Sequence, residues 1–86
     1  MRHARDDALD SLEPVLGQLR GCPELTERSR GTFYKKSQAF VHFHEDPAGL
    51  FADVRLVQGG EFTRMRVSTK AEQRALMSAV RSALAT

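Results

Sequence analysis

Residues 32–68 alternate between apolar and polar side chains, and this pattern constrains the fold more than any other feature of the chain. Alternation with a period of two is typical of strands that bury one face. Asp46-Pro47-Ala48-Gly49 and Gln58-Gly59-Gly60-Glu61 combine the residue types that favour turns. The pattern therefore predicts an antiparallel β-meander with strands at 32–35, 38–45, 50–57 and 62–68.

A helix is predicted before the meander, over residues 6–20. Leucines recur there at three- and four-residue spacing, which is typical of an apolar helical stripe. Pro14 leaves two alternatives, because proline removes a hydrogen bond and clashes with the previous turn inside a helix. Either the helix kinks at Pro14, or it begins with Ser11 as its N-cap and holds Pro14 in its first turn.

A second helix is predicted after the meander, over residues 70–84. Thr69 and Glu72 have the spacing of a capping box, and an apolar stripe follows them. Residues 23–31 are polar and are predicted to form a loop. With 86 residues, the chain has the length of one domain. The predicted fold is a single α+β domain over residues 1–86, in the order α-β-β-β-β-α, with a four-stranded meander and both helices on one face.

Turn lengths set the expected pairing of the strands. The four-residue loop after the second strand places His42 opposite Asp53. A two-residue turn at Gly59-Gly60 places Asp53 opposite Arg66. Both hairpins then assign the same residues of the third strand to the core. The residues expected on this core face are Val41, Phe43, Ala52, Val54, Leu56, Met65 and Val67.

The opposite face of the sheet is predicted to carry the function, since no helix of this chain covers it. Its candidate binding residues are His42, Asp53, Arg66, Arg55, Arg64, Phe40, Phe51 and Phe33. Opposed side chains on a sheet lie close enough for ion pairing. Asp53 should therefore stay ionised and raise the pKa of His42 above its ordinary value of about 6.5.

Three phenylalanines on an uncovered face favour a protein partner, and a second copy of the chain is the simplest one. The leading interpretation is a non-enzymatic module that forms a homodimer or binds a partner. The alternative is a small enzyme or binding protein for an anionic molecule. In that alternative, His42 and Asp53 form an acid–base pair, and Arg55, Arg64 and Arg66 hold the anion.

The same part of the sequence contains residues that could bind a metal ion. His42-Phe43-His44 places two imidazoles on one side of a strand, as a zinc site requires. Arg66 competes for the nearby carboxylate of Asp53, so no metal and no cofactor are predicted. No serine or cysteine stands in the tight turn that a catalytic nucleophile requires, so no catalytic residue is predicted.

Charge and composition restrict the remaining classes. A net charge of +2, from 13 basic and 11 acidic residues, does not favour nucleic-acid binding. Cys22 is the single cysteine of the chain, so an intrachain disulfide is excluded and a reducing compartment is expected. The sequence has no apolar run of membrane-spanning length and no signal-peptide core. A cytoplasmic protein without a membrane segment is predicted.

The run Phe40-Val41-His42-Phe43-His44, followed by a turn and Ala52-Asp53-Val54, resembles the small bacterial luciferase-like domains of unknown activity. The resemblance covers residues 31–57, and the direct turn at Gly59-Gly60 departs from it. The helix–loop–strand entry is also similar to YjbR-type proteins, which lack the paired histidines. These resemblances imply an uncharacterised bacterial domain, and they bring no established catalytic residues to this chain.

Overall fold

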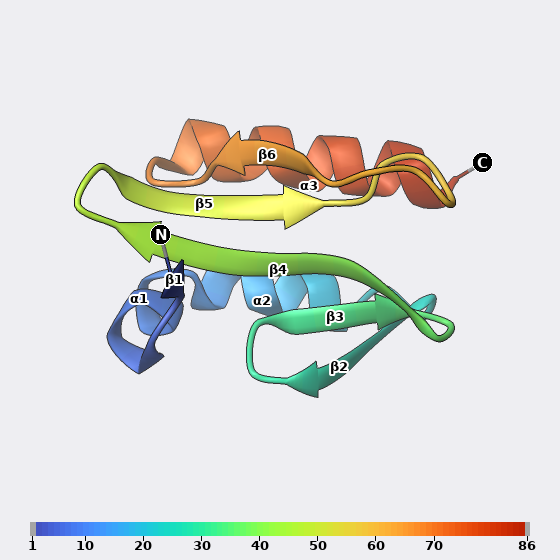
Figure 1. Cartoon of the computed structure of the whole chain (residues 1–86), viewed down its shortest axis with the longest axis horizontal. Coiled ribbons are helices and arrows are strands. Elements are labelled where there is room, and N and C mark those ends of the chain that lie inside the picture. Colours follow the sequence, from blue (N-terminus) through green and yellow to red (C-terminus); the bar gives the residue numbers. More distant parts are fainter. Residues whose placement is uncertain (1, 86) are drawn as a thin grey trace.

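The computed structural model describes residues 2–85, which form an α+β domain built on one antiparallel sheet (Figure 1). The strands are β1 (Arg2–His3), β2 (Leu25–Ser29), β3 (Thr32–Lys35), β4 (Gln38–Asp46), β5 (Gly49–Val54) and β6 (Thr63–Arg66). The helices are α1 (Asp6–Ser11), α2 (Glu13–Arg20) and α3 (Lys70–Leu84). None of the helices found between residues 2 and 85 has the length and apolarity that crossing a membrane requires.

The domain has two layers. The strands follow the order β2-β3-β4-β5-β6, and β1 pairs with β4. In Figure 1, α3 lies behind β5 and β6 and α2 lies behind β4 and β3, whereas α1 lies beside β1, to the left of β3. The helix-covered side is the core face, where Val41, Phe43, Val54 and Leu76 are almost fully buried. The other side has no helical cover and is called the outer face below.

Two strands were missing from the sequence prediction. Residues 23–31 were expected to form a loop, but residues 25–29 form β2, the edge strand beside β3. Leu25 is the buried residue of β2, so the strand has no alternation that could reveal it. β1 consists of two exposed residues, Arg2 and His3, and its pairing with β4 defines it. β1 owes its conformation to β4, which is distant in the sequence, and β2 pairs with β3 in a register that shifts between Glu27 and Ser29.

The helical region before the meander is divided into two helices, α1 and α2. Leu12 lies between them as the C-cap of α1 and the N-cap of α2. Pro14 occupies the first turn of α2, where a missing N–H group costs no helical hydrogen bond. Pro14 thus has the first-turn position of the second alternative, although Leu12, and not Ser11, is the cap.

The helix after the meander agrees with its prediction. α3 covers residues 70–84, and Thr69 is its N-cap. The Thr69 hydroxyl accepts a hydrogen bond from the backbone N–H of Glu72 at 3.1 Å, and the Glu72 carboxylate accepts one from the Thr69 N–H at 3.0 Å. The capping box is therefore complete, and the helix begins where the sequence indicates.

The pairing of β4 with β5 agrees with the predicted register. Val41 faces Val54, His42 faces Asp53, and Phe43 faces Ala52. The pairing continues to Asp46 and Gly49, so the strands are joined by the two residues 47–48 alone, and this short turn leaves no freedom for a slip. β5 ends at Val54, however, and does not extend to residue 57 as predicted.

The pairing of β5 with β6 differs from the prediction by two residues. Asp53 faces Arg64, and Arg66 faces Phe51. The predicted two-residue turn does not form, because residues 55–62 make a longer connection. Arg55 holds this loop by donating to the carbonyl oxygens of Ala39, at 3.0 Å, and of Gly60. A slip of two residues leaves every side chain on its predicted face, so the core assignment survives.

A β-bulge in β4 changes the position of two predicted site residues. Phe33 pairs with Val41 and Tyr34 pairs with Ala39, so Phe40 is the extra residue between them. Phe33 is 0% exposed and Phe40 is 4% exposed, and both belong to the hydrophobic core. The prediction that these two rings lie on the outer face was wrong, since strict alternation cannot anticipate an inserted residue.

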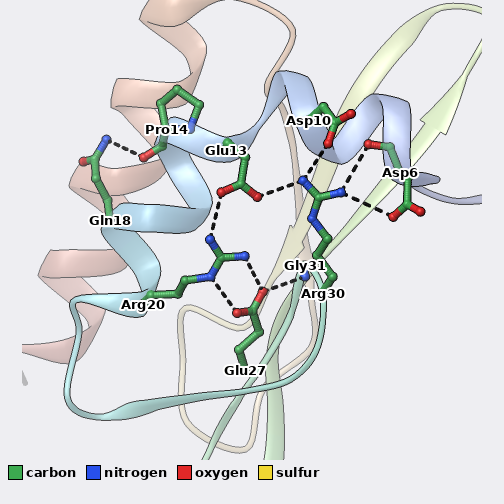
Figure 2. Close-up of polar contacts among 9 residues, drawn as sticks. All are labelled: Asp6, Asp10, Glu13, Pro14, Gln18, Arg20, Glu27, Arg30 and Gly31. Atoms are coloured by element: carbon green, nitrogen blue, oxygen red, sulfur yellow. Dashed lines mark hydrogen bonds and ion pairs between the residues drawn. The ribbon is translucent and has the colours of Figure 1, made fainter.

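A network of ion pairs joins the helices to the β2–β3 hairpin, as Figure 2 shows. Its two cations are Arg20 and Arg30, and its carboxylates belong to Asp6, Asp10, Glu13 and Glu27. Hydrogen bonds from Arg20 and Arg30 lower the pKa of Glu13. Hydrogen bonds from Arg20 and from the Gly31 N–H lower the pKa of Glu27. The network connects segments that lie far apart in the sequence, and its role is structural.

Candidate metal centre

The outer face brings all three histidines of the chain together. His42 and His44 alternate with core residues along β4, so both imidazoles point away from the helices. His3 lies in β1, where it pairs with His44 across the two strands. The histidine cluster is the name used below for His3, His42 and His44.

The three imidazoles of the histidine cluster converge closely. One nitrogen from each ring can be chosen so that the three atoms lie within 4.8 Å of one another. The ring centroids are 4.7 Å apart for His42 and His44, 5.1 Å for His3 and His44, and 5.8 Å for His3 and His42. Within residues 2–85, no other set of three histidine, cysteine or carboxylate side chains meets this distance.

Two nitrogens of the cluster are buried without a hydrogen-bond partner among the described residues. They are Nδ1 of His42 and Nε2 of His44. Nε2 of His44 lies 3.1 Å from Oδ2 of Asp53, close enough for an electrostatic contact, but it is not aligned as a hydrogen-bond donor. Buried polar groups are normally satisfied, so the unpaired Nδ1 of His42, in a converging set of imidazoles, points to a ligand.

Asp53 supports the cluster from the adjacent strand. It is 8% exposed and is the one charged residue buried among residues 2–85. Arg64, from β6, donates two hydrogen bonds to its carboxylate, from Nε at 2.7 Å and from a terminal nitrogen at 2.8 Å. These bonds lower the pKa of Asp53 against the opposing effect of burial. Asp53 is thus held as a carboxylate, in a fixed orientation beside His44.

The pKa of His42 is lowered, which corrects the sequence prediction that Asp53 would raise it. Burial lowers it most, and the neighbouring imidazole of His44 lowers it further, while Asp53 opposes both effects. The expected attraction is weaker because Asp53 directs its carboxylate to Arg64 and His44. A neutral imidazole is the form that binds a metal ion.

The loop at 55–62 covers one side of the cluster. Phe62 places its ring against His42 in an edge-on arrangement, with the centroids 4.8 Å apart. The guanidinium carbon of Arg55 lies 4.3 Å above the Phe62 ring centre. Phe62 of this loop forms an apolar wall beside His42. The guanidinium of Arg55 stacks on the Phe62 ring and donates to two backbone carbonyls.

The remaining predicted site residues do not join the cluster. The Arg66 guanidinium lies 5.7 Å from the Phe51 ring centre, and its Nε lies 3.6 Å from the Glu72 carboxylate. Arg64 and Arg66 thus both have acidic neighbours within the chain, Asp53 and Glu72. With Phe33 and Phe40 in the core, Phe51 is the predicted phenylalanine that stays on the outer face. Two of the three phenylalanines that motivated a homodimer therefore lie in the core.

His3 is the functional residue that sequence reasoning missed. It stands in a segment without periodicity, and a two-residue strand leaves no signal in the sequence. The available hint was that the chain holds only three histidines and that two of them share one side of a strand.

Comparison of the chain with protein-family models, with curated proteins and with solved structures gives no match.

Proposed function

We propose that this protein binds a divalent transition-metal ion through His3, His42 and His44. The observation that supports the proposal is the convergence of three imidazole nitrogens within 4.8 Å. Imidazole is a preferred ligand of zinc, copper and nickel, whereas magnesium and calcium prefer oxygen. A set of three histidines leaves a fourth position for water or another ligand, as in zinc sites that are not purely structural.

The distances require only a modest closure of the cluster. Zinc–nitrogen bonds of about 2.0–2.1 Å in a tetrahedral arrangement place the ligand nitrogens about 3.3 Å apart. The largest separation in the cluster is no more than 4.8 Å, so the rings approach by at most about 1.5 Å on binding. His3 is exposed, and rotation of its side chain provides most of this movement.

The side chains around the cluster are of the kind that orient the histidine ligands of a metal ion. A ligating histidine usually directs its other ring nitrogen to a carboxylate, which fixes the ring and selects the tautomer. Nε2 of His44 lies 3.1 Å from Oδ2 of Asp53, so a small rotation of the ring would let it donate there and would leave the lone pair of Nδ1 for the metal. Arg64 orients the carboxylate in turn. Nδ1 of His42, buried without a partner, would gain one in the metal.

Titration with Zn²⁺ and Co²⁺ tests the proposal. Calorimetry at pH 7.5 should show one ion per chain, and Co²⁺ should give the visible absorption of a low-symmetry nitrogen site. His42→Ala, His44→Ala and His3→Ala should each weaken binding at least about tenfold, since each removes one of three protein ligands. Glu61→Gln is the matched control, because it removes an exposed charge outside the cluster and should leave the affinity unchanged.

Two results would contradict the three-histidine site. One is the absence of stoichiometric binding by the unmodified chain. The other is binding that survives both His42→Ala and His44→Ala, which would place the metal on the N-terminal segment alone. Circular dichroism of each variant separates loss of a ligand from loss of the fold.

A further inference from the structure

The N-terminal strand β1 is attached to the sheet by few contacts. Arg2 and His3 pair with Glu45 and His44 of β4, and the Ala4 N–H donates to the Phe43 carbonyl at 3.0 Å. β1 is only two residues long, and both are exposed. Figure 1 shows it as a short arrow against the edge of β4, close to the N-terminal end of the chain. A segment of this kind belongs to the least stable part of a fold.

Glu45 provides the polar attachment of this segment. Its Oε2 accepts a hydrogen bond from the Arg5 N–H at 2.6 Å, and its Oε1 lies 3.3 Å from a terminal nitrogen of Arg2. The Arg2 side chain is 56% exposed, so the ion pair is screened by solvent and contributes little. Backbone pairing, one carboxylate and the packing of Ala4 against the core therefore hold this segment when no metal is bound.

His3 connects this weakly held segment to the histidine cluster. Its ring is 5.1 Å from His44 and 5.8 Å from His42, centroid to centroid. A metal ion bound by all three rings would bridge β1 and β4 through coordination bonds, in addition to the backbone pairing. Metal affinity and the docking of β1 would then be parts of one equilibrium.

We propose that β1 is a metal-dependent latch: ion binding at the histidine cluster locks residues 2–5 onto β4, and ion release frees them. The inference rests on the proposed function, because His3 is both a ligand and a part of the latch. The coupling is reciprocal by thermodynamic linkage. A change that weakens the docking of β1 must lower metal affinity, even if the changed residue binds no metal.

The latch controls an edge of the sheet. β3 pairs with β4 only as far as His42, and β1 continues along the same edge at His44 and Glu45. A cavity of about 320 Å³ lies at this junction, and His3, Ala4, Thr32 and Phe43 contribute to its walls. Release of β1 would expose backbone groups of Phe43 and Glu45 at an open strand edge, the kind of edge that pairs with other strands.

Hydrogen–deuterium exchange on the full chain tests the latch directly. Saturating Zn²⁺ should slow exchange of the Ala4 and Arg5 amides and of the Phe43 and Glu45 amides at least about tenfold, while α3 should be unchanged. His42→Ala should abolish this metal-induced protection. Equal exchange with and without Zn²⁺, in a chain that calorimetry shows to bind the ion through all three histidines, would overturn the latch and leave the metal site standing.

Glu45→Ala tests the reciprocal half of the coupling. It removes both side-chain attachments of β1 but none of the imidazoles. Zn²⁺ affinity should fall roughly 3- to 10-fold, the loss expected for one charge-assisted hydrogen bond and an exposed ion pair. Glu61→Gln again serves as the control. An unchanged affinity in Glu45→Ala would overturn the coupling, whereas failure of the unmodified chain to bind Zn²⁺ would instead overturn the metal site itself.

Discussion

Replacement of Phe33 by alanine tests the β-bulge that separates the structure from simple alternation. Phe33 is 0% exposed and pairs with Val41, whereas Phe51 is half-buried on the outer face beside Arg66. Strict alternation would have placed both phenylalanines on the outer face, where their truncation would cost about the same. The bulge makes their costs very different, so the pair Phe33→Ala and Phe51→Ala separates the two arrangements.

The expected magnitudes follow from burial. Truncation of a fully buried phenylalanine costs about 3–5 kcal/mol, which combines lost transfer free energy and a cavity. A domain of 86 residues has a free energy of unfolding of about 4–13 kcal/mol. Phe33→Ala should thus lower the melting temperature by about 12–40 °C, at about 4–8 °C per kcal/mol for a domain of this size. Phe51→Ala should cost about 1 kcal/mol, from a partly exposed ring and a distant cation.

Urea unfolding followed by circular dichroism measures both variants against the unmodified chain. The free energy of unfolding should be at least about 2 kcal/mol higher for Phe51→Ala than for Phe33→Ala, at equal slope. Complete loss of the fold in Phe33→Ala alone would agree with the same reasoning. Similar losses in the two variants would show that Phe33 does not lie in the core, and the bulge at Phe40 would be refuted.

Three further perturbations follow from the fold. Leu76→Ala, which truncates the α3 side chain at the centre of the core, should cost about 2–5 kcal/mol in urea unfolding. Gly49→Ala should cost about 1–3 kcal/mol in thermal unfolding, because φ of Gly49 is +138° and the new Cβ would lie 2.5 Å from the Ser68 hydroxyl. Gly59→Ala should cost less, because φ of Gly59 is +75° and nothing lies within 4 Å of the new Cβ. The lowered pKa of Glu27 adds stability that is full above the ordinary glutamate value of 4.5 and is lost as the pH falls through the folded-state value. Arg20→Gln should therefore destabilise the chain at pH 7 more than at pH 3, and a constant difference across this range would show that the ion pair does not form.

The local pattern of the sequence was sufficient for the central part of the fold. Two strands joined by a four-residue loop can pair in few ways, so the positions of His42 and Asp53 opposite each other followed from the turn at 46–49. The capping box at Thr69 and the stripe behind it likewise identified α3, since both signals lie within a few residues. The α+β class and the core face of β4 and β5 rest on these short-range features.

Long-range contacts set the rest, and they leave little trace in a single sequence. The inserted residue at Phe40 becomes apparent only when β3 is paired with β4, and it moves two aromatic rings from the outer face to the core. The loop at 55–62 is held by Arg55 through carbonyls of two separate segments, which moves the partner of Asp53 from Arg66 to Arg64.

The candidate metal centre also combines residues placed by local pattern with a residue placed by a long-range contact. The spacing of His42 and His44 along one strand puts both on the outer face, because a strand repeats every two residues. His3 reaches them from the other end of the sequence, across a pairing between β1 and β4 that spans about forty residues. No periodicity or turn chemistry encodes such a contact; it forms because the completed sheet leaves the edge of β4 open beyond β3, and the short N-terminal strand closes it.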